Sequence, residues 1–238
     1  MTHTHFDQVA RDTGDDPFGA AARAHFEAWM ARDPLTPFGL GKRPALINVD
    51  LQRRYTDTGS FGTAYPGHPE QFTAIDALAS ALRGLGLPVV WTYVAYRPDG
   101  SDCGLWGRRS TSPTAIHTVT EDHPHAELDP RLDVDRARDL VLRKRMASAF
   151  FETHLPSYLR LAGVDSVIVT GGATSGCVRQ TAVDAMSSGL PVTLPLECVA
   201  DREPGPHYAN LYDMATKYAD IRPVVDVLSH LAHLKDQK

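Results

Sequence analysis

The chain has 238 residues, of which 42% are hydrophobic and 22% are charged, a composition typical of a globular protein with one full core. The formal net charge of −5 argues against nucleic acid and anionic membranes as partners. No apolar run approaches the roughly 18 residues of a transmembrane helix, and no basic region followed by an apolar one opens the chain, so we expect no membrane partner and no secretory signal.

Residues 1–40 differ from the rest and are interpreted as an N-terminal extension to a main domain over residues 41–238. Two turn clusters, at residues 15–19 and 33–37, flank a helical stretch over residues 20–31. We expect this extension to pack on the body of the protein or on a neighbouring subunit.

The rest of the chain alternates between apolar strands and amphipathic helices. Strands are predicted over residues 44–49, 88–94, 140–143, 166–170, 191–196 and 221–225. Helices are predicted from about residue 72 to the glycines at 84 and 86, over 155–162, from 178 to 189, over 207–218 and over 227–234. This alternation predicts an α/β fold, a three-layer α/β/α arrangement with a central, mostly parallel sheet. Residues 97–139 show little periodicity and are interpreted as a lid or binding loop.

The three cysteines cannot all pair with one another, and none lies in a Cys-x-x-Cys motif, which favours a reducing, cytoplasmic location. Cys198 ends a predicted strand and is expected to be buried. Cys103 lies in the irregular segment and is expected to be an exposed thiol.

Cys177 lies where the strand over residues 166–170 gives way to a helix. A thiol in the first turn of a helix meets unpaired backbone N–H groups and the positive end of the macrodipole. Both features lower the energy of a thiolate, so Cys177 is a candidate nucleophile. A small buried core cysteine is the alternative on position alone.

Asp50 and Lys144 also follow predicted strands. The carboxyl ends of parallel strands meet at one edge of a sheet, where ligands bind in open α/β folds. Taken alone, Asp50 is explained as a helix cap or surface acid, and Lys144 as a solvated lysine. Coincidence of all three residues at strand ends favours a shared site that contains Asp50, Lys144 and Cys177.

Three separated blocks of sequence carry a resemblance to a known family. They are Val49-Asp50-Leu51-Gln52, Lys144-Arg145-Met146-Ala147-Ser148-Ala149-Phe150-Phe151, and Thr174-Ser175-Gly176-Cys177-Val178-Arg179 with Thr181-Ala182-Val183-Asp184-Ala185. With these blocks the chain resembles the isochorismatase-like cysteine hydrolases from about residue 43 to its end. Cys198-Val199-Ala200-Asp201-Arg202, Pro206-His207 and Asn210-Leu211-Tyr212-Asp213 are similar to the N-carbamoylsarcosine and maleamate amidohydrolase group.

The resemblance implies a catalytic triad. Cys177 would attack the amide or carbamoyl carbon as a thiolate, and Asp50 would take the thiol proton and later give it to ammonia. Lys144 would hold Asp50 ionised and stabilise the thiolate. The backbone N–H groups of Ala173 and Cys177 would form the oxyanion hole, with a cis peptide bond between Gly172 and Ala173. Water would then hydrolyse the thioester.

Neither a metal nor another cofactor is expected. The metal-dependent nicotinamidases of this superfamily carry an Asp-x-His motif near the end of the second strand, where this chain has neither residue. His123 and His125 lie in the irregular segment without convincing zinc spacing.

The substrate is expected to be a small molecule with an amide or carbamoyl group and a carboxylate. In the resembling enzymes an arginine at the position of Arg202 contacts the substrate carboxylate. The planar guanidinium group of arginine matches the geometry of a carboxylate. The alternative for Arg202 is a surface salt bridge to Asp201 or Glu203. Thr174 is expected to face the substrate. Trp106 either covers a small apolar group or simply packs, and Phe150 and Phe151 are expected in the core.

Other functions stay open at this point. The group includes N-carbamoylsarcosine-type and maleamate-type amidases, which the sequence does not separate. A non-amide hydrolase of the same superfamily would not need Cys177, and a non-catalytic binding protein would gain nothing obvious from a charged pair beside a thiol. Homo-oligomers are common in the group, so we expect a tetramer. His207, near Arg202, is expected to cap a helix or to support the site indirectly.

Overall fold

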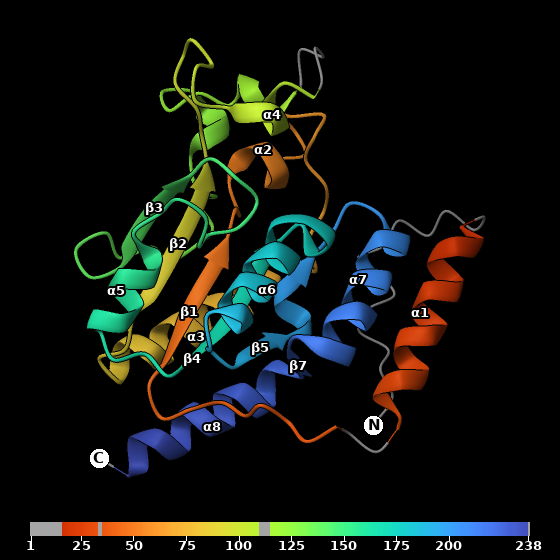
Figure 1. Cartoon of the computed structure of the whole chain (residues 1–238), viewed down its shortest axis with the longest axis vertical. Coiled ribbons are helices and arrows are strands. Elements are labelled where there is room, and N and C mark those ends of the chain that lie inside the picture. Colours follow the sequence, from red (N-terminus) through yellow and green to blue (C-terminus); the bar gives the residue numbers. More distant parts are fainter. Residues whose placement is uncertain (1–15, 33–34, 110–114, 238) are drawn as a thin grey trace.

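A parallel β-sheet forms the centre of the structure (Figure 1). A computed structural model describes residues 16–32, 35–109 and 115–237. Over these ranges the strands are β1 (Pro44–Val49), β2 (Val89–Val94), β3 (Leu140–Lys144), β4 (Ser166–Gly172), β5 (Val192–Pro195), β6 (Val199–Ala200) and β7 (Asp220–Arg222). Their order is β3-β2-β1-β4-β5-β7, with β6 beside the end of β4, and each pairing between them is parallel.

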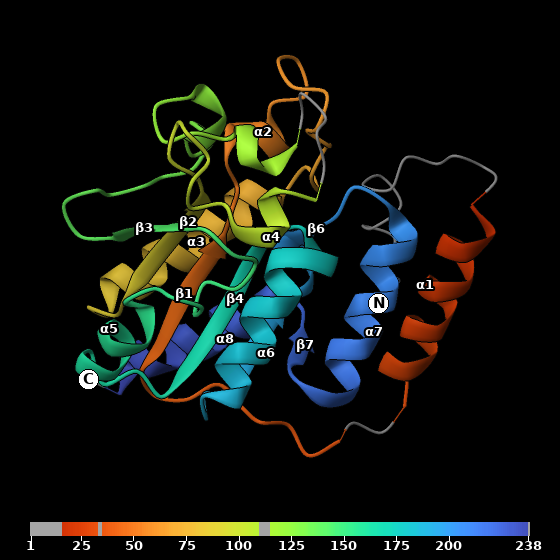
Figure 2. The ribbon, with the colours of Figure 1, turned by 45° about the horizontal axis from the view of Figure 1, so that its top comes forward.

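Helices cover both faces of the sheet, as Figures 1 and 2 show. On one face α3 (Gln71–Gly84) and α8 (Val224–Asp236) pack in an apolar cluster with alternate side chains of the central strands. On the other face lie α5 (Leu155–Leu161), α6 (Arg179–Ser187) and α7 (Pro204–Lys217). Strands buried on both faces consist mostly of apolar residues, and β1 is buried throughout, with Asn48 as its one polar residue. The predicted three-layer α/β/α architecture is confirmed.

Helix α1 (Pro17–Met30) packs outside this sandwich, against α7 (Figure 2). Asp16 caps it by accepting a hydrogen bond from the Gly19 N–H at 2.9 Å. The ring of Phe26 lies 6.0 Å from that of Tyr208 between ring centroids. The predicted helix therefore exists and packs on the body of the same chain. Residues 1–15, 33 and 34, including part of both predicted turn clusters, lie outside the described residues.

In its described residues, the segment over 97–139 forms no helix longer than four residues, in line with its lack of periodicity. They are α4 (Gly104–Gly107), η1 (Ile116–Thr118) and η2 (Pro124–Ala126), and α2 (Arg53–Thr56) lies beside them above the carboxyl ends of the strands (Figure 1). Isolated bridges pair Gln52 with Leu128 and Tyr96 with Thr120. Residues 110–114 lie outside the described part of the chain.

Several boundaries differ from those predicted. Strand β7 ends at Arg222 rather than near residue 225, because Pro223 is the N-cap of α8 and Val224 its first residue. Strand β6 is too short to show an apolar pattern. Cys103 is buried, with 3% exposure, in a small cluster with Val94 and Tyr96, so the prediction of an exposed thiol is wrong. In the described ranges we find no helix with the length and apolar character needed to span a membrane.

Candidate active site

The carboxyl ends of three strands bring Asp50, Lys144 and Cys177 together. Asp50 follows β1, Lys144 is the last residue of β3, and Cys177 lies just beyond β4. The Nζ atom of Lys144 is 2.7 Å from Oδ2 of Asp50, and both side chains are fully buried. The thiol of Cys177 is within hydrogen-bonding reach of both groups. A buried ion pair in direct contact with a thiol is an arrangement for proton transfer.

Asp50 is held by its neighbours on β2. Its backbone has a φ of 52°, in the left-handed region, which Asp tolerates better than most residues. Its N–H donates to the carbonyl of Thr92 at 3.1 Å, and the hydroxyl of Thr92 donates to Asp50 Oδ1 at 2.8 Å. One carboxylate oxygen thus faces Thr92 while the other faces Lys144.

Lys144 is held in its charged form by its partners. Burial lowers the pKa of Lys144, but the Asp50 carboxylate and Cys177 outweigh that effect, and the pKa lies above its ordinary value. The ammonium also donates to the carbonyl of Met146 at 3.0 Å. These contacts fix the cation at one point, beside both the acid and the thiol.

Cys177 lies in a π-helical turn, η3 (Thr174–Val178), between β4 and α6. Burial raises the pKa of the Cys177 thiol to about 12, Lys144 opposes this rise, and Asp50 adds to it. The position at a helix start favours a lowered thiol pKa, but the pKa is raised because burial outweighs the effect of Lys144. A protonated thiol beside an ionised carboxylate needs that carboxylate to remove its proton.

Of the two predicted oxyanion donors, Ala173 is the N-cap of this turn and Cys177 lies within it. The peptide bond between Gly172 and Ala173 is cis, as the resemblance implies. The carbonyl of Ala173 accepts hydrogen bonds from the N–H groups of Gly176 at 3.0 Å and Val178 at 3.2 Å, which ties the strand end to the turn. Gly171 has a φ of 109°, and a Cβ there would collide with the backbone of Val49, so only glycine fits beside β1.

Thr174 is buried and points toward α7. Its Oγ1 lies 2.9 Å from Nδ1 of His207, which is itself buried. Burial lowers the pKa of His207 to about 4, so the imidazole is neutral near pH 7. The hydroxyl predicted to face the substrate is thus engaged with His207, and His207 supports the nucleophile turn through Thr174.

Asp201 and Arg202 follow β6, which pairs with the end of β4. Oδ2 of Asp201 accepts a hydrogen bond from the Ser175 N–H at 2.7 Å, which fixes the start of the nucleophile turn. The guanidinium of Arg202 is exposed and donates to the carbonyl of Gly62 at 2.8 Å. Its alternative role, a salt bridge to Asp201 or Glu203, is not formed in the described part of the chain. An arginine guanidinium has five N–H donors, and the bond to Gly62 uses one of them, so donors remain for another partner.

Trp106 lies on α4, half-buried against the core. It borders a cavity of about 350 Å³ together with Met146 and Phe151. The carbonyl of Met146 accepts the hydrogen bond from Lys144, whereas Asp50, Lys144 and Cys177 themselves do not line this cavity. Phe150 is buried as expected, whereas Phe151 is 50% exposed, so its predicted place in the core is wrong.

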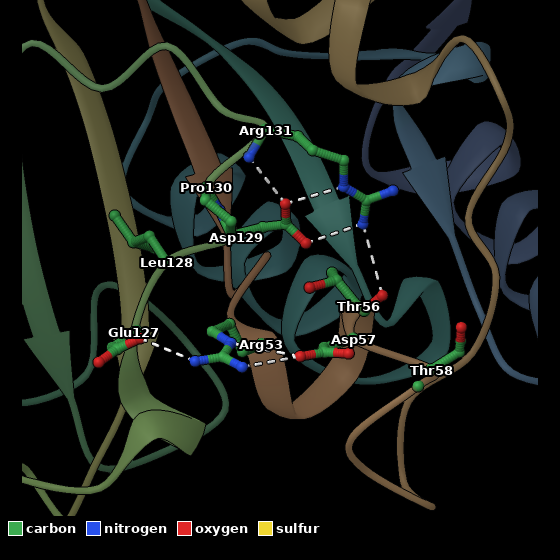
Figure 3. A pocket seen from close by; sticks show the side chains of 10 residues that line it. Arg53, Thr56, Asp57, Thr58, Glu127, Leu128, Asp129, Pro130 and Arg131 are labelled. Carbon is green, nitrogen blue, oxygen red and sulfur yellow. Dashed lines mark hydrogen bonds and ion pairs between the residues drawn. The ribbon is translucent and has the colours of Figure 1, made fainter.

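A larger cavity, of about 530 Å³, lies between α2 and residues 127–131 (Figure 3). Its two arginines are already neutralised: Arg53 pairs with Asp57 and Glu127, and Arg131 with Asp129. None of the predicted catalytic or substrate-binding residues lines it. Within the described ranges, no group of three or more His, Cys, Asp or Glu side chains is arranged to hold a metal ion. The rings of His123 and His125 lie 4.2 Å apart between centroids and are tilted by 40°.

Three residues that support the site were not singled out from the sequence. Thr92 binds Asp50, and Asp201 binds the nucleophile turn. Tyr65 is buried beside Gly172. Thr92 carried a signal, because it interrupts an otherwise apolar strand. The other two lie in loops, where sequence alone does not fix position.

The chain is similar to known proteins over most of its length. Residues 44–225 match the model of the isochorismatase domain. The chain is 37% identical over 199 residues to a maleamate amidohydrolase of Pseudomonas putida, covering 82% of this chain and 90% of that protein. It is 35% identical over 198 residues to an N-carbamoylsarcosine amidase of Arthrobacter, covering 81% and 73%. A cysteine hydrolase from Pseudomonas syringae has the same fold, with a TM-score of 0.77 at 21% identity, covering 85% and 99%.

Proposed function

Because the chain belongs to the isochorismatase family, we propose that it is an amidohydrolase that cleaves the C–N bond of a small linear amide or carbamoyl acid through Cys177. The observation that carries this proposal is the contact of the Cys177 thiol with the buried pair of Asp50 and Lys144. An acid, a cation and a thiol in mutual contact supply a nucleophile together with a group to move its proton.

In the first step Sγ of Cys177 attacks the amide carbon, and its proton passes to Asp50. The S–C bond forms as the carbonyl π-electrons move onto oxygen. Lys144 offsets the negative charge that leaves Asp50 for sulfur and oxygen. The N–H groups of Ala173 and Cys177 are proposed to stabilise the oxyanion, since they belong to the turn that carries the nucleophile.

The tetrahedral intermediate then collapses. The C–N bond breaks, Asp50 gives its proton to the departing nitrogen, and ammonia and a thioester result. Water attacks the thioester while Asp50 accepts a proton from it. The C–S bond breaks, the proton returns to sulfur, and the carboxylic or carbamic acid product leaves. Asp50 therefore acts as base and acid in turn, while Lys144 remains charged throughout.

We propose that the substrate carries a carboxylate, which the exposed guanidinium of Arg202 binds with the donors that Gly62 does not use. Both relatives named above act, by their names, on maleamate or N-carbamoylsarcosine, and both of those compounds carry a carboxylate and a terminal amide or carbamoyl group. Trp106 is proposed to border the substrate, because it lines a cavity together with Met146, whose carbonyl accepts a hydrogen bond from Lys144.

A tetramer in a reducing, cytoplasmic setting remains part of the proposal. The three cysteines are free, and a reducing compartment keeps the Cys177 thiol available for attack. Light scattering checks the assembly, and a monomeric mass contradicts it.

The test of the proposed activity is ammonia release from N-carbamoylsarcosine, maleamate, biuret, ureidoacrylate and nicotinamide, with Cys177→Ser as the blank for contaminating amidases. Release from a carboxylate-bearing amide by the wild type, absent in the variant, supports the proposal. Release from none of them contradicts it, and leaves an ether or ester hydrolase or a binding protein as the better account.

A further inference from the structure

Tyr65 carries a hydroxyl that its surroundings do not explain. Its side chain is 92% buried, with 8% exposure, and its Oη is shielded from solvent. Among the described residues this hydroxyl has no hydrogen-bond partner. Buried polar groups almost always have one, so each exception needs an account.

The hydroxyl lies at the candidate active site. A Cβ built on Gly172 would overlap Tyr65 Oη, so the phenol tip rests against the residue that precedes the proposed oxyanion donor Ala173. Cys177, Asp50 and Asp201 are also near enough to act on the phenol electrostatically. Only glycine at position 172 leaves room for the phenol tip there.

The segment that carries Tyr65 is fixed at several points. Its own N–H donates to the carbonyl of Tyr55 at 3.0 Å, and the hydroxyl of Thr63 donates to the carbonyl of Arg54 at 2.9 Å. Arg202 holds the same segment through Gly62. A side chain on such an anchored segment is positioned before any substrate binds, which lowers the entropic cost of a contact with it.

Tyr65 is a hydrogen-bond donor and not a base. Burial raises the pKa of the phenol well above its ordinary value, and the negative charge of Asp201 raises it further. The hydroxyl therefore keeps its proton at every pH at which the protein works. Among the described residues, no oxygen atom accepts a hydrogen bond from the Tyr65 hydroxyl.

We propose that the Tyr65 hydroxyl donates a hydrogen bond to an oxygen atom of the substrate bound at Cys177. This inference rests on the proposed amidohydrolase function. The acceptor is an oxygen of the reacting carbonyl or of the substrate carboxylate, and the kinetics distinguish the two. Loss of a contact to the reacting carbonyl lowers kcat, whereas loss of a contact to the carboxylate raises KM.

Tyr65→Phe removes only the oxygen atom. We expect kcat/KM for the best amide to fall about 10–100-fold. We expect the melting temperature to stay the same or rise, because the variant loses a buried hydroxyl that has no partner in the free protein. Lower activity together with unchanged or higher stability indicates that the hydroxyl contacts the substrate and does not stabilise the fold.

Two matched variants calibrate these readouts. Tyr96→Phe deletes a buried hydroxyl that does have a partner, the carbonyl of Arg145 at 2.8 Å, and should lower the melting temperature by about 2–4 °C. Tyr158→Phe deletes a hydroxyl on α5, near Asp139 at the other end of β3, and should leave kcat/KM unchanged.

The inference is overturned if Tyr65→Phe lowers kcat/KM less than fivefold. It is also overturned if the variant loses as much thermal stability as Tyr96→Phe, since the hydroxyl then serves the fold. If the wild type is active and Tyr65→Phe equally so, this inference alone fails. If the wild type releases ammonia from no amide, the proposed function fails, and the role of Tyr65 falls with it.

Discussion

Lys144 and Asp50 form an ion pair of 2.7 Å in which neither side chain meets solvent. Taking two charges out of water is costly, and their mutual attraction offsets this cost only while both partners are present. The two residues lie 94 positions apart in sequence, so the fold itself maintains the pair. A buried ion pair in general adds little net stability to a fold. The contact of this pair with a thiol favours a catalytic role for it.

Lys144→Met should therefore affect both stability and activity. The substitution leaves Asp50 buried without its cation, and we expect the free energy of unfolding to fall by about 3–5 kcal/mol. Activity should fall below detection, because the charge that moves onto sulfur and oxygen loses its counter-ion. Urea denaturation gives the first quantity and ammonia release the second.

The matched control is the double variant Asp50→Asn with Lys144→Met, which removes both charges. It should recover a large part of the lost stability without recovering activity. A double variant less stable than Lys144→Met alone would contradict an account based on the uncompensated charge.

The raised pKa of Cys177 makes a prediction about its protonation. With a pKa of about 12, the thiol of the free enzyme is protonated at pH 7. The difference in absorbance at 240 nm between the wild type and Cys177→Ser should be close to zero from pH 6 to 9 and should grow only above about pH 10. A thiolate signal at pH 7 would show instead that Lys144 outweighs burial and Asp50.

His207 predicts how stability depends on pH. Its pKa lies at about 4 in the folded state, against 6.5 unperturbed, so the unfolded chain binds more protons between these values. The stability contributed by neutral His207 is fully present above about pH 6.5 and is lost as the pH falls toward 4. The full effect is about 3 kcal/mol.

The check is the slope of the free energy of unfolding between pH 6.5 and 4 in His207→Gln. The slope should be smaller than in the wild type. Equal slopes in the wild type and His207→Gln would refute a buried neutral His207.

The fold was predictable because its longer strands are mostly apolar and alternate with amphipathic helices. Both ends of strand β1 were predicted correctly, and the start of β2 was predicted one residue early. Asp50 marks the end of the apolar run in β1, and Pro88 directly precedes β2. Strand β7 was misplaced because the β-branched residues Ile221, Val224 and Val225 favoured one strand, whereas Pro223 separates the strand from the helix that begins at Val224. Strand β6 has two residues and no pattern to find.

The site was predictable where residues sit at strand ends, because topology alone brings those ends together. Asp50, Lys144 and Cys177 are of this kind. The contacts of Thr174 and Tyr65 were not predictable, since they depend on how α7 and a loop pack against the nucleophile turn. The direction of the Cys177 pKa shift was also missed, because burial in three dimensions leaves no trace in the local sequence.

Arg202 provides a test of substrate class. Arg202→Gln should raise KM for a carboxylate-bearing amide about 10–100-fold, since a charge-assisted contact is lost. KM for an uncharged amide such as nicotinamide should change little. An equal rise for both substrates would assign Arg202 to holding the loop at Gly62 rather than to the carboxylate.

The central claim is that Cys177 is the nucleophile. The most direct measurement is kcat for ammonia release from the best amide, compared between the wild type and Cys177→Ala, with both proteins shown to have the same melting profile. The account predicts a loss of about 10⁴-fold or more in the variant, because no other group can form the thioester. A variant that keeps its rate within tenfold of the wild type would contradict it.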